Sequence, residues 1–218
     1  MKKYKLTTET LQFAGRTLHR IKAVKDFDSI KAGEFGGWIE NEKNLSQDDN
    51  AWIYGNAMVF DNAMVFDNAK VYGNAKVYGN ANVSDYANVF GNANVFGNAE
   101  VYGNANVFGY ANVSGNAEVS DYSEVSDYAK VYGNAAIKGD AKVHDAVDYI
   151  VFKNFWSSGR YFTWTSSNNK WSVGCFYGTG EELIKKAYAD SEKSGREYER
   201  VVRYVESILA DEKKEKSN

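Results

Sequence analysis

A six-residue repeat constrains the fold of this chain more than any other feature. From residue 51 to residue 141, Ala stands at every sixth position with Ser123 in the single gap, and Val or Ile follows two residues later, which gives sixteen hexads in phase. Residues two apart in an extended chain point to the same side, so Ala and Val predict an inward-facing strand. Gly, Asp or Asn follow, and these residues tolerate the left-handed backbone of a tight corner. Each hexad therefore predicts one short strand and one corner, stacked coil upon coil.

The hexads resemble those of a known family. The stretch "VYGNAK" at residues 71–76 resembles the repeat of left-handed parallel β-helix proteins, and the resemblance extends weakly back to Leu45, which holds the Ala phase. It implies a left-handed coil of triangular cross-section, while the strict six-residue phase argues against a prism of pentapeptide repeats. The segments "GGWIE", "NLSQ" and "NAWIYGNA" are also similar to phage and bacterial hexapeptide-repeat proteins that are labelled as transferases. We therefore predict a mainly β chain with an N-terminal β cap and lead-in coil at residues 1–44, a β-helix at 45–144 and a small α+β module at 145–218.

The two ends of the chain leave the repeat. Residues 1–50 predict two strands joined by a turn at 14–16, and a solenoid needs such a cap because its end exposes a sheet edge. After the last hexad, the runs "DYIVFKNF", "RYFTWTSS" and "KWSVGCF" predict three strands. Thr179 with Glu182 predicts a capping box that opens a helix, and Gly195 predicts the end of that helix before a second one.

Aromatic rings follow the same six-residue grid. The position after Val holds Tyr or Phe in ten hexads, and where it holds Ser, Tyr often stands two residues later, as at Ser84 with Tyr86. These rings are expected to face outward and to stack on the rings eighteen residues away. A column of exposed rings is typical of a contact between copies of a chain, and bracing of the corners is the alternative role. The column that we predict to form this contact is Tyr54, Tyr72, Phe90 and Phe108. A homo-oligomer follows, and the resemblance favours a trimer, then a dimer.

The sequence offers few groups for catalysis. The resemblance to β-helix acyltransferases implies a histidine base in the coils and a loop projecting from a corner, but the histidines are His19 and His144, and no hexad carries an insertion. His144 is thus a weak catalytic candidate. Cys175 is expected to be a buried strand residue, and a nucleophile pair with His144 is the alternative. We expect no metal and no cofactor. Acidic residues at the corners could bind a cation, but we interpret them first as solvated turn residues. They are Asp61, Asp67, Asp85, Asp121 and Asp127.

The C-terminal module holds a group of candidate ligand contacts. Trp and Arg are the composition of binding hot spots and of base-stacking sites. The residues that we expect to contact a protein partner or a small nucleotide-like ligand are Trp156, Arg160, Tyr161, Trp164 and Trp171. Packing beneath the helices is the alternative for at least one of Trp164 and Trp171.

Composition and charge narrow the functional classes. The net charge is −3, and residues 51–144 carry five basic against nine acidic side chains, so we expect no nucleic-acid partner. A single cysteine, no signal-peptide pattern and no membrane-length apolar run predict a cytoplasmic protein, in the host cell if a phage encodes it. We predict a non-enzymatic binding or assembly protein: a rigid scaffold for oligomers with a partner-binding C-terminal module, for example a phage-type inhibitor of a host-defence component. The alternative is an acyl- or nucleotidyl-type transferase with its site between protomers.

Overall fold

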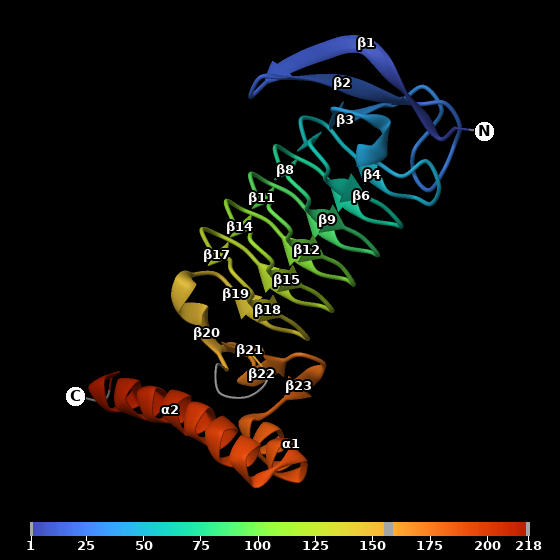
Figure 1. Cartoon of the computed structure of the whole chain (residues 1–218). Helices are drawn as coiled ribbons and strands as arrows, with labels where there is room; N and C mark the ends of the chain where they lie inside the picture. The colour runs from blue at the N-terminus through green and yellow to red at the C-terminus, as the bar shows by residue number, and fades with distance from the viewer. Residues whose placement is uncertain (1, 155–158, 217–218) are drawn as a thin grey trace.

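Each hexad forms one two-residue strand and one turn, and the strands stack into a parallel β-solenoid (Figure 1). This computed structural model describes residues 2–154 and 159–216. Neighbouring coils pair in one constant register, so that Val71 lies opposite Val89 and Val89 lies opposite Val107. The predicted hexapeptide solenoid is confirmed, and the chain is mainly β.

The solenoid has three faces. The first face consists of β3 (Phe35–Ile39), β5 (Met58–Val59), β8 (Lys76–Val77), β11 (Asn94–Val95), β14 (Asn112–Val113) and β17 (Lys130–Val131). The second consists of β4 (Trp52–Ile53), β7 (Lys70–Val71), β10 (Asn88–Val89), β13 (Asn106–Val107), β16 (Glu124–Val125) and β19 (Lys142–Val143). The third consists of β6 (Met64–Val65), β9 (Asn82–Val83), β12 (Glu100–Val101), β15 (Glu118–Val119) and β18 (Ala136–Ile137).

Three corners join these faces, and each corner takes the number of the face that precedes it. Corner 1 is defined by the column Asn62, Asn80, Asn98, Asn116 and Asn134. Corner 2 is defined by Asn56, Asn74, Asn92, Tyr110 and Tyr128. Corner 3 is defined by Asn68, Tyr86, Asn104, Tyr122 and Asp140.

The inward side chains form one continuous core. The Ala, Val and Ile residues at the two inward positions of the hexads have no exposed surface, which confirms the predicted inward assignment. Ser123, which replaces Ala once, is also fully buried, and its hydroxyl donates a hydrogen bond to the Ser120 carbonyl at 2.6 Å. That bond satisfies a polar group that would otherwise be costly in an apolar core.

A hairpin covers the N-terminal end, as predicted. Its strands β1 (Tyr4–Phe13) and β2 (Arg16–Ala23) pair in antiparallel fashion, and Ala14 and Gly15 form the turn with φ angles of 51° and 79°. Strand β2 pairs with β3, which pairs in parallel with β5, so the hairpin continues the first face. The short helix η1 (Glu42–Asn44) then leads into the coils.

A four-stranded antiparallel sheet and two helices follow the last coil. The elements are η2 (Ala146–Asp148), β20 (Tyr149–Lys153), β21 (Tyr161–Thr165), β22 (Lys170–Val173), β23 (Phe176–Gly178), α1 (Gly180–Asp190) and α2 (Glu192–Lys216). The predicted capping box is present, because the Thr179 hydroxyl accepts a hydrogen bond from the Glu182 amide while the Glu182 carboxylate accepts one from the Thr179 amide.

Two predictions for this module are wrong. Gly195 lies inside α2, because the first helix already ends at Asp190 and Ser191 separates the two helices. Glycine is required at position 195 for packing, since a side chain there would overlap the Tyr188 ring. Cys175 is exposed instead of buried in a strand. Its neighbour Gly174 has a φ of 58° and turns the run "KWSVGCF" into two strands, which leaves Cys175 at the tip of a turn.

Candidate functional site

The predicted aromatic column is present at the edge of corner 2. Tyr72, Phe90 and Phe108 stack face to face with centroid distances of 4.8 Å at each step, and Tyr54 meets Tyr72 edge-on at 6.4 Å. A second column of Phe60, Tyr78 and Phe96 runs beside corner 1 at steps of 5.0 Å. At each stacked step one ring covers the face of the next, so these columns are partly buried.

Five tyrosines on the coils are much more exposed than the columns. Tyr110 and Tyr128 stack on each other at 5.2 Å on corner 2, beside the lower end of the Phe108 column, and are 53% and 74% exposed. Tyr86 and Tyr122 lie on corner 3, two coils apart, and are 62% and 71% exposed. Tyr132, beside corner 1, is 62% exposed. Corner 2 therefore carries the one contiguous pair of exposed rings within the described coils.

The corner aspartates bind the backbone of the neighbouring coil. Asp85 and Asp121 adopt φ angles of 54° and 60°, and their carboxylates accept hydrogen bonds from the amides of Gly103 at 2.9 Å and Gly139 at 2.8 Å. Their role as turn residues thus has a direct structural basis. Across residues 2–154 and 159–216, no three His, Cys, Asp or Glu side chains gather closely enough to hold a metal ion.

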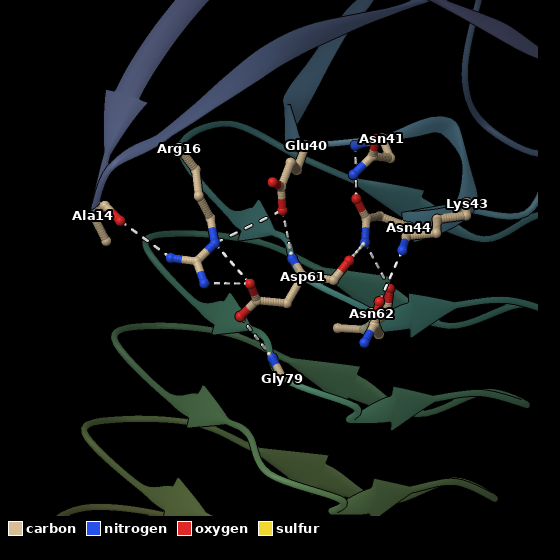
Figure 2. Close-up of polar contacts among 10 residues, drawn as sticks. Ala14, Arg16, Glu40, Asn41, Lys43, Asn44, Asp61, Asn62 and Gly79 are labelled. Atoms are coloured by element: carbon tan, nitrogen blue, oxygen red, sulfur yellow. Dashed lines mark hydrogen bonds and ion pairs between the residues drawn. The ribbon is translucent and has the colours of Figure 1, made fainter.

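A polar network fastens the N-terminal hairpin to the first coils (Figure 2). The Arg16 guanidinium forms an ion pair with Asp61, and its Nε lies 3.8 Å from the Glu40 carboxylate. The same Glu40 carboxylate accepts a hydrogen bond from the Asp61 backbone amide at 2.7 Å, while the Asp61 carboxylate accepts one from the Gly79 amide at 3.2 Å. Arg16 also covers the Phe60 ring at 5.3 Å. Because these groups are paired with one another, the network is best explained as a lock between cap and solenoid.

The same polar network continues to corner 1, as Figure 2 shows. The Asn44 side-chain amide donates to the Asp61 and Ala63 carbonyls at 3.1 and 2.8 Å, and Lys43 donates to the Asn62 side chain at 2.8 Å. A shallow polar hollow of about 360 Å³ lies here. Its lining groups are joined by these same bonds, so it offers a ligand few partners.

His144, the catalytic candidate, lies at the end of the second face. Its Nδ1 is 2.7 Å from the Ser126 hydroxyl and 3.3 Å from the Asp127 carboxylate. In a Ser–His–Asp triad the acid orients the ring through the nitrogen opposite the serine. Here both oxygens meet the same nitrogen, so Asp127 does not orient His144 in that way. Ser126 carries no signal for this role in the sequence, because its contact with His144 depends on the stacking of two coils.

The structure separates the five ligand candidates. Trp164 and Trp171 are 4% and 2% exposed and belong to the core between the sheet and the helices, so the packing alternative describes both. Trp156 lies outside the described residues. Arg160 and Tyr161 line a hollow between the sheet and the solenoid. Among the four candidates that the structure describes, these are the two that it brings together at a surface.

The C-terminal sheet docks on the last coil through hydrogen bonds. The Ala136 amide donates to the Thr163 hydroxyl at 2.9 Å, and the Lys142 amide donates to the Ser167 hydroxyl at 2.7 Å. The Tyr149 hydroxyl donates to a carbonyl of the coil above it, that of Lys130, at 2.8 Å, and burial raises the pKa of Tyr149. The module is therefore held against the solenoid along a defined seam.

A cleft in two parts opens along this seam. One part, of about 280 Å³, is lined by Asn116, Glu118, Asn134, Ala135, Ala136, Lys138, Arg160, Tyr161, Ser172 and Gly174. The other, of about 410 Å³, is lined by Tyr132, Gly133, Asn134, Ala146, Tyr149, Ile150, Val151 and Tyr161. Asn134 and Tyr161 belong to both, so we treat the two parts as one junction cleft. Sequence reasoning found Arg160 and Tyr161 but missed the coil residues, because only the docking of the module places them opposite each other.

Comparison with known proteins gives a partial match. No family model matches the chain. The protein named uncharacterized acetyltransferase YdcK from Escherichia coli (strain K12) is 39% identical over an alignment of 62 residues, and the match covers 25% of this chain and 19% of that protein. The chain thus matches less than a fifth of the relative's length. Within the part of the chain that the structure describes, no helix is long and apolar enough to cross a membrane. The in-phase hexads and the three-faced solenoid show a hexapeptide-repeat β-helix fold, and this partial likeness fits it.

Proposed function

We propose that the chain is a binding and assembly scaffold that self-associates through corner 2. The exposed, stacked pair Tyr110 and Tyr128 carries this proposal. Tyrosine is enriched in protein interfaces because it offers a large apolar ring together with a polar tip. The neighbouring column of Tyr72, Phe90 and Phe108 gives the pair a rigid support. The resemblance to β-helix proteins favours a trimer first and a dimer next, and most homo-oligomers have closed symmetry.

Light scattering on the purified chain tests the self-association. The wild type is expected to show a mass above one chain in the micromolar range, and Tyr110→Ser with Tyr128→Ser is expected to lower it. The double variant Tyr86→Ser with Tyr122→Ser is the matched control, because those rings are also more than half exposed but lie on corner 3. Phe90 and Phe108 are poor test positions, since their loss would also break the stacked column. A monomeric wild type would end the proposal.

We propose that the C-terminal module binds a protein partner. A host-defence component is the class of partner to test first. Support comes from the resemblance to phage-type proteins and from the exposed Tyr204 on α2, which is 56% exposed. A pull-down from host lysate with the full chain tests it. Recovery of one protein that Tyr204→Ser abolishes would support this surface, and equal recovery with that variant would contradict it.

A transferase is the second candidate function. The transferase label of the partial relative and the 2.7 Å contact between Ser126 and His144 favour it. A histidine base must lie within hydrogen-bond reach of the proton that it removes, which this contact satisfies for the serine hydroxyl. The assay is release of free coenzyme A from acetyl-coenzyme A with common acceptors. Turnover that His144→Ala abolishes would favour the transferase over the scaffold.

A further inference from the structure

The apolar part of the junction cleft is a tyrosine-lined surface. Tyr132, Tyr149 and Tyr161 line it together with Ile150 and Val151. Aromatic walls of this kind favour a planar ring, because stacking adds to the area buried. The rings of the two stacked columns are largely covered by their neighbours, whereas Tyr132 is 62% exposed and offers its ring to the cleft.

Tyr132 keeps an open face because of a gap in the repeat. The ring column beside corner 1 runs through Phe60, Tyr78 and Phe96 and is then interrupted by Ser114, one coil above Tyr132. At other Ser positions of the grid a tyrosine stands two residues later, but after Ser114 that position is Asn116. Tyr132 is therefore not held in a column from above, which agrees with its 62% exposure.

The other part of the cleft is polar and carries two cationic side chains. Lys138 and Arg160 lie on opposite walls, the first on the solenoid and the second beside β21. Glu118 is the one carboxylate in this lining, and it forms an ion pair with Lys138 at 3.2 Å. The side-chain amides of Asn116 and Asn134 also line it, and the Asn116 Nδ2 donates a hydrogen bond to the Asn134 Oδ1 at 3.3 Å. Guanidinium and ammonium groups with neighbouring amides suit an anion such as a phosphate.

We propose that the junction cleft binds a planar aromatic ligand that carries an anionic group, which is the chemistry of a nucleoside monophosphate. The ring lies against Tyr132 and Tyr161, and the anion lies towards Lys138 and Arg160. The two parts, of about 280 and 410 Å³, match the size of ordinary small-molecule sites. This proposal does not depend on self-association through corner 2, which lies on another edge of the solenoid.

Calorimetric titration with three probes tests the proposal: AMP, adenosine and ribose 5-phosphate. AMP is expected to bind more tightly than either fragment, because only AMP fills both parts. Tyr132→Ala is expected to weaken the binding of AMP and of adenosine about tenfold, which is the usual effect of losing one stacked ring. The binding of ribose 5-phosphate is expected to stay unchanged. The double variant Lys138→Gln with Arg160→Gln is expected to lower the affinity for AMP to that for adenosine.

Tyr86→Ala is the matched control, because Tyr86 has the same exposed fraction as Tyr132 but lies on corner 3. It is expected to bind AMP like the wild type, and thermal melting confirms that each variant is folded. No AMP binding at millimolar concentration, or equal losses in Tyr132→Ala and Tyr86→Ala, would overturn the proposal. Binding of adenosine as tight as that of AMP would overturn the anionic part and leave a site for an uncharged ring, such as an aromatic side chain of a partner.

Discussion

At the scale of single residues, the corners depend on side chains that tolerate a positive φ. Asp85 has a φ of 54°, and its carboxylate accepts the Gly103 amide of the next coil at 2.9 Å. Alanine lacks that acceptor and is disfavoured in the left-handed region by about 1–2 kcal/mol. Asp85→Ala is therefore expected to destabilise the fold by about 2 kcal/mol in urea unfolding. Asp85→Gly is expected to cost less, since glycine supplies the φ; an Ala variant as stable as the Gly variant would contradict this account.

The gap at Ser114 gives a second prediction at the same scale. A ring there would stack between Phe96 above and Tyr132 below, completing a column whose existing steps are 5.0 Å. Ser114→Phe is expected to stabilise the protein by about 1 kcal/mol, the usual gain of an aromatic pair. The melting temperature should then rise by about 2–4 °C for a chain of this size. Ser114→Leu is the control, because it adds apolar area without stacking; an equal rise with Leu would show that area alone is responsible.

At the scale of elements, sequence reasoning succeeds where contacts are local or periodic. Val95 and its equivalents face inward because alternation and the six-residue period determine their side, and both can be read from the chain. The exposure of Cys175 could not be predicted, because one positive φ at Gly174 splits an apparent strand. The junction cleft could not be predicted either. Tyr132 and Tyr161 line one hollow only because the module that follows the last coil folds back onto β18.

The first element of the cap gives a prediction about pH. Lys3 is 1% exposed, and its ammonium donates to the Asp48 and Ala51 carbonyls at 3.0 and 2.9 Å. Burial lowers the pKa of Lys3 from 10.5 to about 8, against the opposing effect of Asp49 and Asp48. Between these two pKa values the unfolded chain binds more protons, so the free energy of unfolding rises with pH. Between pH 8 and 10 this contribution is expected to add about 2 kcal/mol.

Lys3→Met isolates this effect, because the variant lacks the titrating group. The difference in unfolding free energy between wild type and variant should grow from pH 8 to pH 10, as measured by urea unfolding. Burial raises the pKa of Tyr4, whose hydroxyl donates to the Leu45 carbonyl at 2.8 Å. The unfolded tyrosine therefore loses its proton first, and stability should fall again above about pH 10 in both proteins. A difference that stays constant with pH would contradict the assignment to Lys3.

At the scale of the whole molecule, the direction of the stack determines the chemistry of both caps. The coil amides donate towards the C-terminal end, as Trp52 does to the Ala69 carbonyl. The first coil is thus left with carbonyls, and the N-terminal cap supplies the donors Lys3 and Tyr4. The last coil is left with amides, and the C-terminal module supplies the acceptors Thr163 and Ser167. Such caps are what a solenoid needs to cover its two unlike ends.

This polarity predicts how the molecule opens when one cap is weakened. Thr163 is 1% exposed, and its hydroxyl accepts the Ala136 amide at 2.9 Å. Thr163→Val keeps the shape but leaves that amide without an acceptor, at a cost of about 1–3 kcal/mol. Because each coil contacts only its neighbours, the loss should act locally. Hydrogen exchange is expected to quicken at Ala136 and Lys142 in the variant, while the amide of Trp52 near the other end keeps its protection. Equal loss at both ends would mean that the solenoid opens as one cooperative unit, and an unchanged Ala136 amide would mean that the hydroxyl is not its acceptor.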